Sequence, residues 1–348
     1  MDLAVVIVSY NVQKLLHDCL ESLLASLART PELAAEVWVV DNASADGSAA
    51  MVAEAFPAVR LIASPENLGY SAGNNLALQL LGFSPARDEA RPVSDYPWAA
   101  EQPRPAGQPR HVWLLNPDTV VQGDAAAQLV RFMDETPLAG ACGAQLSYPG
   151  GSFQHGAFRF PGLAQLTLDF FPPPGRLNQP LLDSRLNGRY PRRLVEQGQP
   201  FPVDFVLGAT LLVRGETLRQ VGLLDEGYFM YCEEMDWQRR AQRAGWRVYC
   251  VPSAHVVHVA GASSSQFRSR SFKALWQSRL RYYRRYHSPA FNRAAARLLR
   301  AGLRAEARRA RQQAPDDLPQ RLVAYAEVEQ MALSGKGLDR MQMNTDRR

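Results

Sequence analysis

The sequence predicts an α/β fold in which a mostly parallel sheet is flanked by helices and followed by a basic helical arm. Short apolar runs rich in Val and Ile alternate with segments whose apolar residues recur at helical spacing, as in successive strand–helix units. The 348 residues, 46% hydrophobic and 21% charged, are ordinary for a globular protein of about two domains. This composition excludes a wholly disordered chain, a collagen and a coiled-coil rod.

The first 135 residues contain four strands and four helices in alternation. Residues 3–8 are a continuous apolar run, as expected of a strand buried on both faces of a parallel sheet. Pro57 ends the second helix, and Ser71 is expected to cap the third. The predicted strands are 3–8, 37–40, 59–63 and 111–115, and the predicted helices are 12–28, 44–56, 71–81 and 124–135.

Two long segments lack clear periodicity. Residues 83–110 contain six prolines, and we expect an exposed, partly disordered insertion there. Residues 149–200 are expected to be irregular, either as a lid over a site or as a long excursion. Regular structure is predicted again at 203–213, 216–221, 234–244 and 246–251. The predicted organisation is a main domain at 1–265, a basic aromatic helical arm at 266–311 and a polar tail at 312–348.

The charge is concentrated in the arm. Residues 268–311 hold 14 basic residues and one acidic residue, a net charge of +13, whereas the rest of the chain has a net charge of −8. Such a segment suits a phosphate-bearing partner, either nucleic acid, anionic lipid or a lipid diphosphate. The alternative is a solvated helix face that binds nothing.

The cysteines and the N-terminus indicate the compartment. Cys19, Cys142, Cys232 and Cys250 have no metal-binding or CxxC spacing, so we expect free thiols in or near the core. The sequence contains no run of about 18 apolar residues, so no transmembrane helix is predicted. The N-terminus lacks the basic region and cleavage site of a secretory signal. We therefore expect a cytoplasmic protein.

Polar side chains follow three of the predicted strands. The sequence continues as Ser9-Tyr10-Asn11 after the first strand, Asp41-Asn42-Ala43-Ser44 after the second and Asn116-Pro117-Asp118 after the fourth. Ligands of open parallel sheets bind at the carboxyl ends of strands, and Asp41 is suited to accept a hydrogen bond from a ring N–H or a ribose hydroxyl. Each Asp alone is equally typical of a helix cap or a turn. The sequence has neither GxxxxGK[ST] nor GxGxxG, which disfavours a P-loop enzyme and a dinucleotide dehydrogenase.

Seven segments of the sequence stand out as motifs. They are VIVSYN (6–11), VVDNASADG (39–47), NLGYSAGNN (67–75), LLNPD (114–118), GATLLVR (208–214), FMYCEEMD (229–236) and VPSAHVVH (251–258). With these segments in family order, the chain resembles the family 2 glycosyltransferases, most closely their bacterial rhamnosyltransferase-like branch, over about residues 3–290. This resemblance implies the GT-A fold, with a Rossmann-like sheet.

The resemblance implies transfer of a sugar from a nucleoside-diphosphate donor to a hydroxyl, with inversion at the anomeric carbon. It assigns a divalent metal, Mg²⁺ or Mn²⁺, to Asp118 and His258. Asn116 stands where the metal motif has its first acidic position, so it is assigned to the ribose or to metal-bound water. For His255, a histidine satisfied within the fold is the more plausible interpretation.

An acidic cluster supplies the expected general base. The family's acidic pair corresponds to Glu233 and Glu234, and its base corresponds to Glu234, where relatives usually have Asp. Asp236 and Arg240 match the family's downstream acidic and basic positions. Negative charge also favours a helix N-terminus, but three acids in four residues exceed what capping requires.

The resemblance also assigns the donor contacts. Gly208, Ala209, Arg214 and Arg240 are assigned to the donor or acceptor sugar, and for Arg214 a structural salt bridge is an equal alternative. The residues assigned to the nucleotide are Ser9, Tyr10, Asn11, Asp41, Asn42, Ser44, Asn67, Gly69, Asn74 and Asn116.

The leading hypothesis is an inverting, metal-dependent glycosyltransferase that uses a dTDP- or UDP-linked sugar such as dTDP-rhamnose. Its acceptor is a saccharide or a lipid-linked saccharide, as in cell-wall polysaccharide assembly. The arm is expected to contact anionic lipid on the inner face of the plasma membrane or the acceptor's phosphate, and not nucleic acid, although its aromatic residues also suit packing against the main domain.

Two other hypotheses stay open. One is a catalytically weakened nucleotide-binding module of the same fold that docks on an anionic membrane or polyanion through the arm. The other, a nucleotidyltransferase on a related fold, lacks the expected Gly-rich phosphate loop and Lys.

Overall fold

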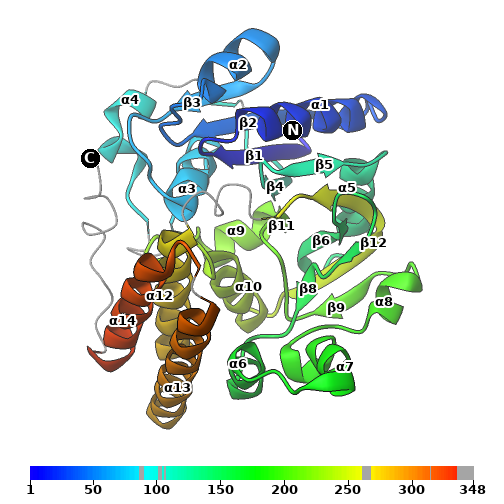
Figure 1. The fold of residues 1–348 in the computed structure, drawn as a ribbon. Coiled ribbons are helices and arrows are strands. Elements are labelled where there is room, and N and C mark those ends of the chain that lie inside the picture. Colours follow the sequence, from blue (N-terminus) through cyan, green and yellow to red (C-terminus); the bar gives the residue numbers. More distant parts are fainter. Residues whose placement is uncertain (86–89, 101–103, 106, 261–267, 314, 335–348) are drawn as a thin grey trace. The chain divides into compact units, whose positions relative to one another are not determined.

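The computed structural model describes residues 1–85, 90–100, 104–105, 107–260, 268–313 and 315–334 (Figure 1). The chain divides into two compact units. Unit 1 comprises Met1–Arg159, Tyr190–Gly227 and Glu233–Ser263, and unit 2 comprises Phe160–Arg189, Tyr228–Cys232 and Ser264–Arg348. Among the described residues, no helix has both the length and the apolar character needed to cross a membrane.

Unit 1 is built on a ten-stranded sheet in the order β3-β2-β1-β4-β11-β6-β12-β5, with β7 beside β6 and β9 beside β12. The pairs β3-β2, β2-β1 and β1-β4 are parallel, as predicted. From β11 onward the sheet is mixed, because β11 is antiparallel to both of its neighbours. The larger strands are β1 (Leu3–Ser9), β2 (Ala35–Asp41), β3 (Arg60–Ala63), β4 (His111–Leu115), β5 (Thr119–Val121), β6 (Ala139–Ser147), β11 (Thr210–Arg214) and β12 (Arg247–His258).

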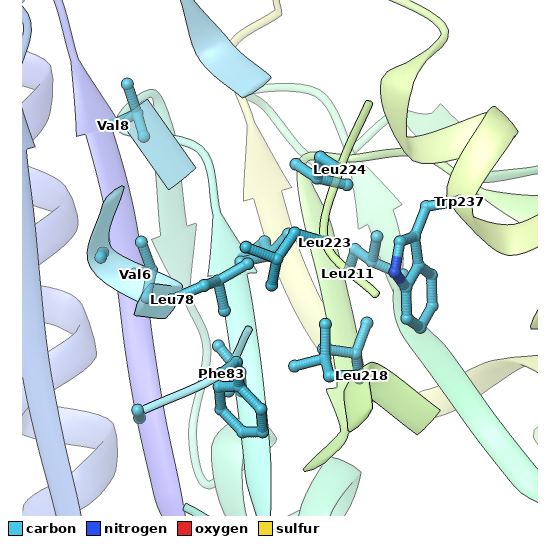
Figure 2. Packing of buried hydrophobic residues seen from close by; sticks show 14 of the residues in the cluster. Val6, Val8, Leu78, Phe83, Leu211, Leu218, Leu223, Leu224 and Trp237 are labelled. Atoms are coloured by element: carbon cyan, nitrogen blue, oxygen red, sulfur yellow. The ribbon is translucent and has the colours of Figure 1, made fainter. Parts of the chain in front are cut away.

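Helices cover the sheet on both sides, so β1 is buried on both faces. Alternate residues of β1 belong to two hydrophobic cores, with Val6 and Val8 in one and Val5 and Ile7 in the other. Figure 2 shows the first core, in which Val6 lies with residues of α3, β11 and α10. The helices of unit 1 are α1 (Gln13–Ala28), α2 (Ser48–Ala55), α3 (Tyr70–Leu80), α4 (Pro97–Ala100), α5 (Ala125–Glu135), α8 (Arg192–Glu196), α9 (Gly215–Val221) and α10 (Glu233–Arg243), with a 3₁₀ turn, η1, at Val93–Asp95.

The proline-rich insertion is more ordered than predicted. Its described residues include η1 and α4, and Tyr96 is buried. The Gln79 side chain on α3 donates to the Arg91 carbonyl at 2.8 Å and accepts from the Val93 N–H at 2.8 Å. These bonds satisfy backbone groups that a proline-rich segment does not pair by itself, so the expectation of an irregular insertion is wrong for residues 93–100.

The segment predicted to be irregular, 149–200, also contains regular structure. Short strands pair with the main sheet or with each other, and the 3₁₀ turns and helices are brief. Elements this short carry little hydrophobic periodicity, which is why the sequence did not reveal them. They are β7 (Phe153–Gln154), β8 (Ala157–Phe158), α6 (Leu163–Phe170), η2 (Gly175–Leu177), α7 (Asn178–Leu182), η3 (Arg185–Asn187) and α8, followed by β9 (Phe201–Val203) and β10 (Phe205–Val206).

Unit 2 combines α6 with the C-terminal helices α12 (Arg268–Tyr286), α13 (Pro289–Gln313) and α14 (Leu318–Ser334). Trp276 stacks on Phe170 with ring centroids 5.3 Å apart, and Arg279 binds Asp169 at 2.7 Å. A side chain at position 302 would collide with the Phe170 ring, so Gly302 is required where α13 passes α6.

The expectation of a polar C-terminal tail is therefore corrected, and for the arm aromatics the packing alternative is favoured. Residues 318–334 are a helix with buried Val328 and Met331, and not part of a polar tail. Several arm aromatics, Trp276 and Tyr282 among them, are buried inside unit 2 and are not exposed for a partner. All four cysteines are buried and free, as predicted.

Candidate active site

The carboxyl ends of three neighbouring strands form one edge of the sheet, as the strand-end motifs predict. The register pairs Ser9 of β1 with Asp41 of β2, and β4 lies on the other side of β1. The Asn42 N–H donates to the Ser9 carbonyl at 2.8 Å, which joins the two strand ends directly. We refer to the carboxyl ends of these strands, residues 9–11, 41–44 and 116–118, as the polar edge.

Several buried polar atoms of the polar edge have no hydrogen-bond partner among the described residues. They include Ser9 Oγ, Asp41 Oδ1, Asn42 Oδ1 and Asn74 Oδ1. The other oxygen of Asp41 accepts from the Ser44 N–H at 2.9 Å, which holds the carboxylate in place. An unsatisfied buried polar group costs about 1–3 kcal/mol, so we expect a polar ligand or ordered water to complete these bonds.

The loops after β1 and β2 are strained and tied together. Asn11 and Ala43 have positive φ angles of 52° and 62°, which are uncommon outside glycine. The Asn11 N–H donates to Ser44 Oγ at 3.0 Å, and Asn11 Oδ1 accepts from the Ala45 N–H at 2.7 Å. Asn11 and Ser44, both assigned to the nucleotide, therefore also shape the loops. Tyr10 is half-buried in the same turn.

The second predicted nucleotide loop joins this edge through Asn42, whose side-chain amide donates to the Gly69 carbonyl at 3.1 Å. Asn67 Oδ1 accepts from the Gly69 N–H at 2.9 Å, and Gly69 has φ 82°, a conformation that glycine adopts readily. Asn74 donates to the Tyr70 carbonyl at 2.9 Å.

The predicted cap of α3 is wrong. The helix begins at Tyr70, with Gly69 at the cap position and no side-chain cap bond, so Ser71 already lies inside the first turn. Its Oγ is buried without a partner among the described residues.

Asp118 and His258 lie side by side, although they are 140 positions apart in the sequence. His258 Nε2 is 3.4 Å from Asp118 Oδ1, and both residues are buried. His258 is the last residue of β12, which is longer than predicted and pairs His258 with Thr119 of β5. Gln154 Oε1 lies 3.2 Å from Nδ1 and orients the ring. His255 instead binds Ser147 Oγ at 2.9 Å.

This pair fits a divalent cation of the Mg²⁺ or Mn²⁺ kind. One carboxylate oxygen and one imidazole nitrogen leave the remaining coordination positions for phosphate and water. Among the described residues, the group of three or more possible ligands lies elsewhere, at His17, Asp18 and Glu21 on the surface of α1. Asn116 holds the adjacent loop through its backbone, since its N–H donates to the Ala209 carbonyl at 3.1 Å.

The acidic cluster forms the first turn of α10, and its members differ in environment. Glu233 is buried, and its Oε2 has no hydrogen-bond partner among the described residues. Burial raises the pKa of Glu233 well above its ordinary value, and the neighbouring Glu234 carboxylate raises it further. Glu234 lies against Gly208, where an added Cβ would be 3.4 Å from Glu234 Cγ. The environment therefore disfavours the ionised form of Glu233.

Four predicted site residues have structural environments that do not support their predicted roles. Asp236 is fully buried and forms an ion pair with Arg240 at 2.9 Å, and Arg240 also donates to the carbonyls of Val221 and Leu223. Ala209 belongs to a hydrophobic core. All three residues match positions of the family motifs, but the contacts of their side chains are within the fold.

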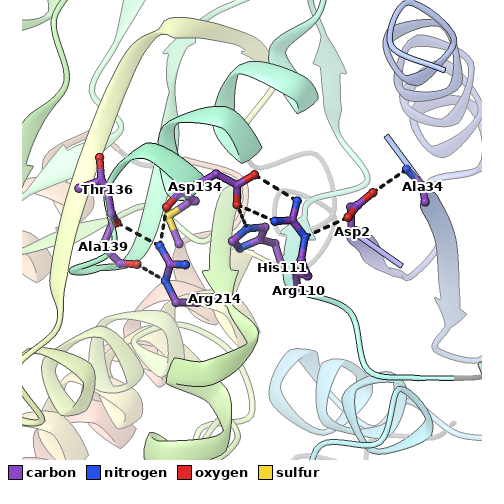
Figure 3. Close-up of polar contacts among 9 residues, drawn as sticks. Asp2, Ala34, Arg110, His111, Asp134, Thr136, Ala139 and Arg214 are labelled. Atoms are coloured by element: carbon purple, nitrogen blue, oxygen red, sulfur yellow. Dashed lines mark hydrogen bonds and ion pairs between the residues drawn. The ribbon is translucent and has the colours of Figure 1, made fainter. Parts of the chain in front are cut away.

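Arg214 is the clearest correction. It pairs in register with His111 at the end of the sheet opposite to the polar edge. Its guanidinium donates to the carbonyls of Ala139 at 2.8 Å and Thr136 at 3.0 Å (Figure 3). We therefore withdraw the predicted contact between Arg214 and a sugar.

Tyr70 is a site residue that the sequence analysis did not single out, although it lies within the NLGYSAGNN segment. Its hydroxyl donates to the Gly208 carbonyl at 3.2 Å. Burial raises the pKa of this phenol well above its ordinary value, and the carboxylates of Glu233, Glu234 and Asp118 contribute in the same direction. The carboxylates of Glu233, Glu234 and Asp118 are thus all close enough to Tyr70 to act on its phenol.

Comparisons with known proteins identify the family. The sequence matches the family described as "Glycosyltransferase like family 2" over residues 2–285. It is 31% identical to the N-acetylglucosaminyl-diphospho-decaprenol L-rhamnosyltransferase of Mycobacterium tuberculosis (strain H37Rv) over 69% of this chain and 71% of that protein. It is 39% identical to the rhamnosyltransferase WbbL of Escherichia coli (strain K12) over 24% of this chain and 31% of that protein.

A solved structure matches the fold. The mannosyltransferase of Pyrobaculum calidifontis, in complex with GDP-Man and Mn²⁺, has a TM-score of 0.52 and 17% identity, with 96% of this chain and 76% of that chain covered.

The fold and the matches define the protein as a glycosyltransferase of the GT-A fold. The match over residues 2–285 covers most of the chain. The chain belongs to glycosyltransferase family 2 and has rhamnosyltransferase relatives.

Proposed function

We propose that the protein transfers rhamnose or another deoxyhexose from a dTDP- or UDP-linked donor to a hydroxyl of a saccharide or lipid-linked acceptor, with inversion. The observation that carries this proposal is the Asp118–His258 pair at 3.4 Å, whose Asp118 carboxylate acts on the Tyr70 phenol together with that of Glu234, beside a strand end rich in polar atoms without a partner among the described residues. The relatives named as rhamnosyltransferases support the choice of sugar.

Glu234 is the general base of the proposed reaction. Of the three acids, Asp236 is neutralised by Arg240, and burial disfavours ionised Glu233. Glu234 takes the proton from the acceptor hydroxyl as its oxygen attacks the anomeric carbon and the bond to the nucleoside diphosphate breaks. The absence of a side chain at Gly208 leaves space beside the Glu234 carboxylate for the reacting sugars.

The metal pair faces the leaving group in this proposal. Asp118 and His258 would hold Mg²⁺ or Mn²⁺, which when bound neutralises the charge that develops on the diphosphate. The unpartnered oxygens of Asp41 and Asn42 accept hydrogen bonds from the base or ribose.

The acceptor assignment rests on charge and on the relatives. The Mycobacterium tuberculosis relative is named for a saccharide linked to a polyprenol through a diphosphate. Exposed arginines of α13 suit the phosphates of such an acceptor, or an anionic membrane surface on which it resides. These residues are Arg293, Arg297, Arg308 and Arg311. We propose peripheral attachment at the inner face of the plasma membrane.

A donor screen tests the proposal. The protein is incubated with dTDP-, UDP- and GDP-linked sugars and Mg²⁺ or Mn²⁺, and release of nucleoside diphosphate is measured with and without an N-acetylglucosaminyl-diphospho-polyprenol acceptor. We expect acceptor-dependent turnover with a dTDP- or UDP-linked deoxyhexose. Asp118→Ala is expected to abolish turnover, whereas Asp124→Ala, a change at the N-cap position of α5 six residues further on, is the matched control. Acceptor-dependent turnover that survives Asp118→Ala unchanged would contradict the assigned metal pair.

The alternative is a catalytically weakened nucleotide-binding module that docks on anionic surfaces through its basic helices. The resemblance implies an Asp at the position of Glu234, and this departure from the family pattern is what favours the module. Calorimetric titration with dTDP and UDP, with and without Mn²⁺, separates the two proposals when combined with the screen. Nucleotide affinity without turnover on any donor would favour the module.

A further inference from the structure

A cavity with a volume of about 390 Å³ lies within unit 1, apart from the candidate active site. Its walls come from β6, β7, β12 and α8, and its polar side chains are Gln145, Ser147, Arg192, Glu196 and His255. This volume lies within the range of about 300–1,000 Å³ typical of small-ligand pockets. None of these side chains takes part in the proposed transfer reaction.

Strand alternation separates this cavity from the metal pair. Side chains three positions apart on a strand point to opposite faces, so His255 and His258 leave β12 on opposite sides. The register pairs Gln145 with His255 and Ser147 with Phe153, and all four residues line the cavity. Gln154 and His258 lie on the other face, where they bind each other. The sheet itself therefore lies between the two sites.

The cavity is polar but electrically balanced. Arg192 Nε lies 2.9 Å from Glu196 Oε1, so the two charged side chains of the wall neutralise each other. Burial lowers the pKa of His255, which favours its uncharged form, and its ring binds Ser147 Oγ at 2.9 Å. An anion or a cation would find no net opposite charge here.

The remaining chemistry of the walls suits a sugar. Gln145, Ser147 and His255 offer both donors and acceptors, as the hydroxyl groups of a sugar require. Val195 and Pro252 supply apolar surface for the C–H faces of a ring, whereas the Phe153 ring already has the Arg192 guanidinium over it at 5.3 Å. A neutral polyhydroxyl ligand matches both properties, whereas a nucleotide or a phosphate matches neither.

We propose that this cavity is a second saccharide-binding site, on the face of the sheet opposite to the metal pair, that takes a neutral mono- or disaccharide unit. Its role is binding and not transfer, so it holds a saccharide segment apart from the reacting groups. The inference does not depend on the proposed donor or on Glu234.

Saturation-transfer difference NMR tests this site with free L-rhamnose, N-acetylglucosamine and diacetylchitobiose as probes. We expect at least one probe to give a signal that persists in Glu234→Gln and with saturating dTDP or UDP. The double variant Gln145→Ala/His255→Ala is expected to lower that signal about fivefold, through loss of two hydrogen-bonding groups. No signal from any probe, a signal unchanged by the double variant, or one abolished by Glu234→Gln alone would overturn the proposal.

A second variant guards against misfolding. Glu196 is exposed, so Glu196→Gln does not endanger the fold, but it leaves Arg192 uncompensated. We expect a saccharide signal at least about twofold lower, with unchanged melting temperature and nucleotide affinity. Inorganic phosphate that binds the wild-type cavity more tightly than the sugars, and is released by Arg192→Gln, would make this an anion site and refute the inference.

Discussion

The two ends of the sheet in unit 1 treat polar groups in opposite ways. At the end away from the polar edge, the Arg110 guanidinium binds both Asp134 oxygens at 3.1 Å, and His111 Nε2 binds the same carboxylate at 3.0 Å (Figure 3). At the polar edge, buried oxygens of Ser9 and Asp41 have no partner among the described residues. The Asp134 carboxylate is therefore paired with cationic groups, whereas one oxygen of the Asp41 carboxylate is left to a ligand or to water.

The largest expected effect is a loss of turnover without a loss of stability. Glu234→Gln removes the proposed base, and we expect kcat to fall by about 10²–10⁴-fold while donor affinity and melting temperature stay close to wild type. Steady-state kinetics and calorimetry measure these quantities. Glu216→Gln is the matched control, because Glu216 is an exposed acid in the first turn of another helix, α9. Full activity of Glu234→Gln would remove Glu234 from the mechanism.

Arg214→Ala is expected to show the reverse pattern. The change leaves main-chain carbonyls of the 133–139 turn without their donor, so we expect the free energy of unfolding to fall by about 2–4 kcal/mol. The activity of the folded fraction should stay within about twofold of wild type, because Arg214 is remote from the polar edge. Urea denaturation measures the loss, and Arg214→Lys should recover only part of it. A selective rise in donor KM would restore the original sugar-contact interpretation.

The same substitution at each end sharpens the contrast further. Asp41→Asn is expected to weaken dTDP or UDP binding by about tenfold, since a hydrogen bond to a charged group contributes about 1.5–3 kcal/mol. Asp134→Asn should instead lower the melting temperature and leave nucleotide affinity unchanged, because Asp134 binds Arg110 and His111. Titration calorimetry and thermal unfolding compare the two variants. Equal effects on binding would contradict the division between the two ends.

The smallest expected effect is a pH dependence that differs in sign between the two ends. Burial and Glu234 raise the pKa of Glu233 in the folded state above its ordinary value of 4.5. The folded state thus holds this proton more tightly than the unfolded state, so stability falls as pH rises from about 4.5 through the raised pKa. Glu233→Gln should flatten this fall in a series of urea titrations.

Asp134 provides the opposite case. Burial alone would raise its pKa, but hydrogen bonds from His111 and Arg110 outweigh burial and lower the pKa below its ordinary value of 3.8. Its contribution to stability is therefore present above about pH 3.8 and is lost as pH falls through the lowered pKa.

A Glu233→Gln variant whose stability between about pH 4.5 and 7 keeps the wild-type slope would contradict the assignment for Glu233.

Sequence reasoning predicted the polar edge well because local signals determine it. Each apolar run ends at its polar motif, and the parallel pairing of β1 with β2 and β4 then brings Ser9, Asp41 and the Asn116 loop to one side. The first four strands agree with prediction to within two residues. The direction of β11 and the length of β12 depend on tertiary pairing, which the sequence pattern does not encode.

The charged residues whose predicted roles are not supported share one cause. Arg214 and Asp236 occupy motif positions, yet a motif position does not reveal whether a charged side chain already binds main-chain carbonyls or an opposite charge. Tyr70 was missed for the complementary reason, because an aromatic residue at a helix start is ordinary in sequence. Only the structure shows that the carboxylates of Glu233, Glu234 and Asp118 act on its phenol.

Unit 2 has a practical consequence for anyone who shortens or recombines this enzyme. Because α6 comes from the middle of the chain and packs with α13 through Phe170 and Gly302, the C-terminal helices are not a detachable module. A truncation at residue 265 would strip α6 of its packing partners and leave Asp169 without Arg279. Chimeras between relatives therefore need to exchange residues 160–189 together with the C-terminal helices.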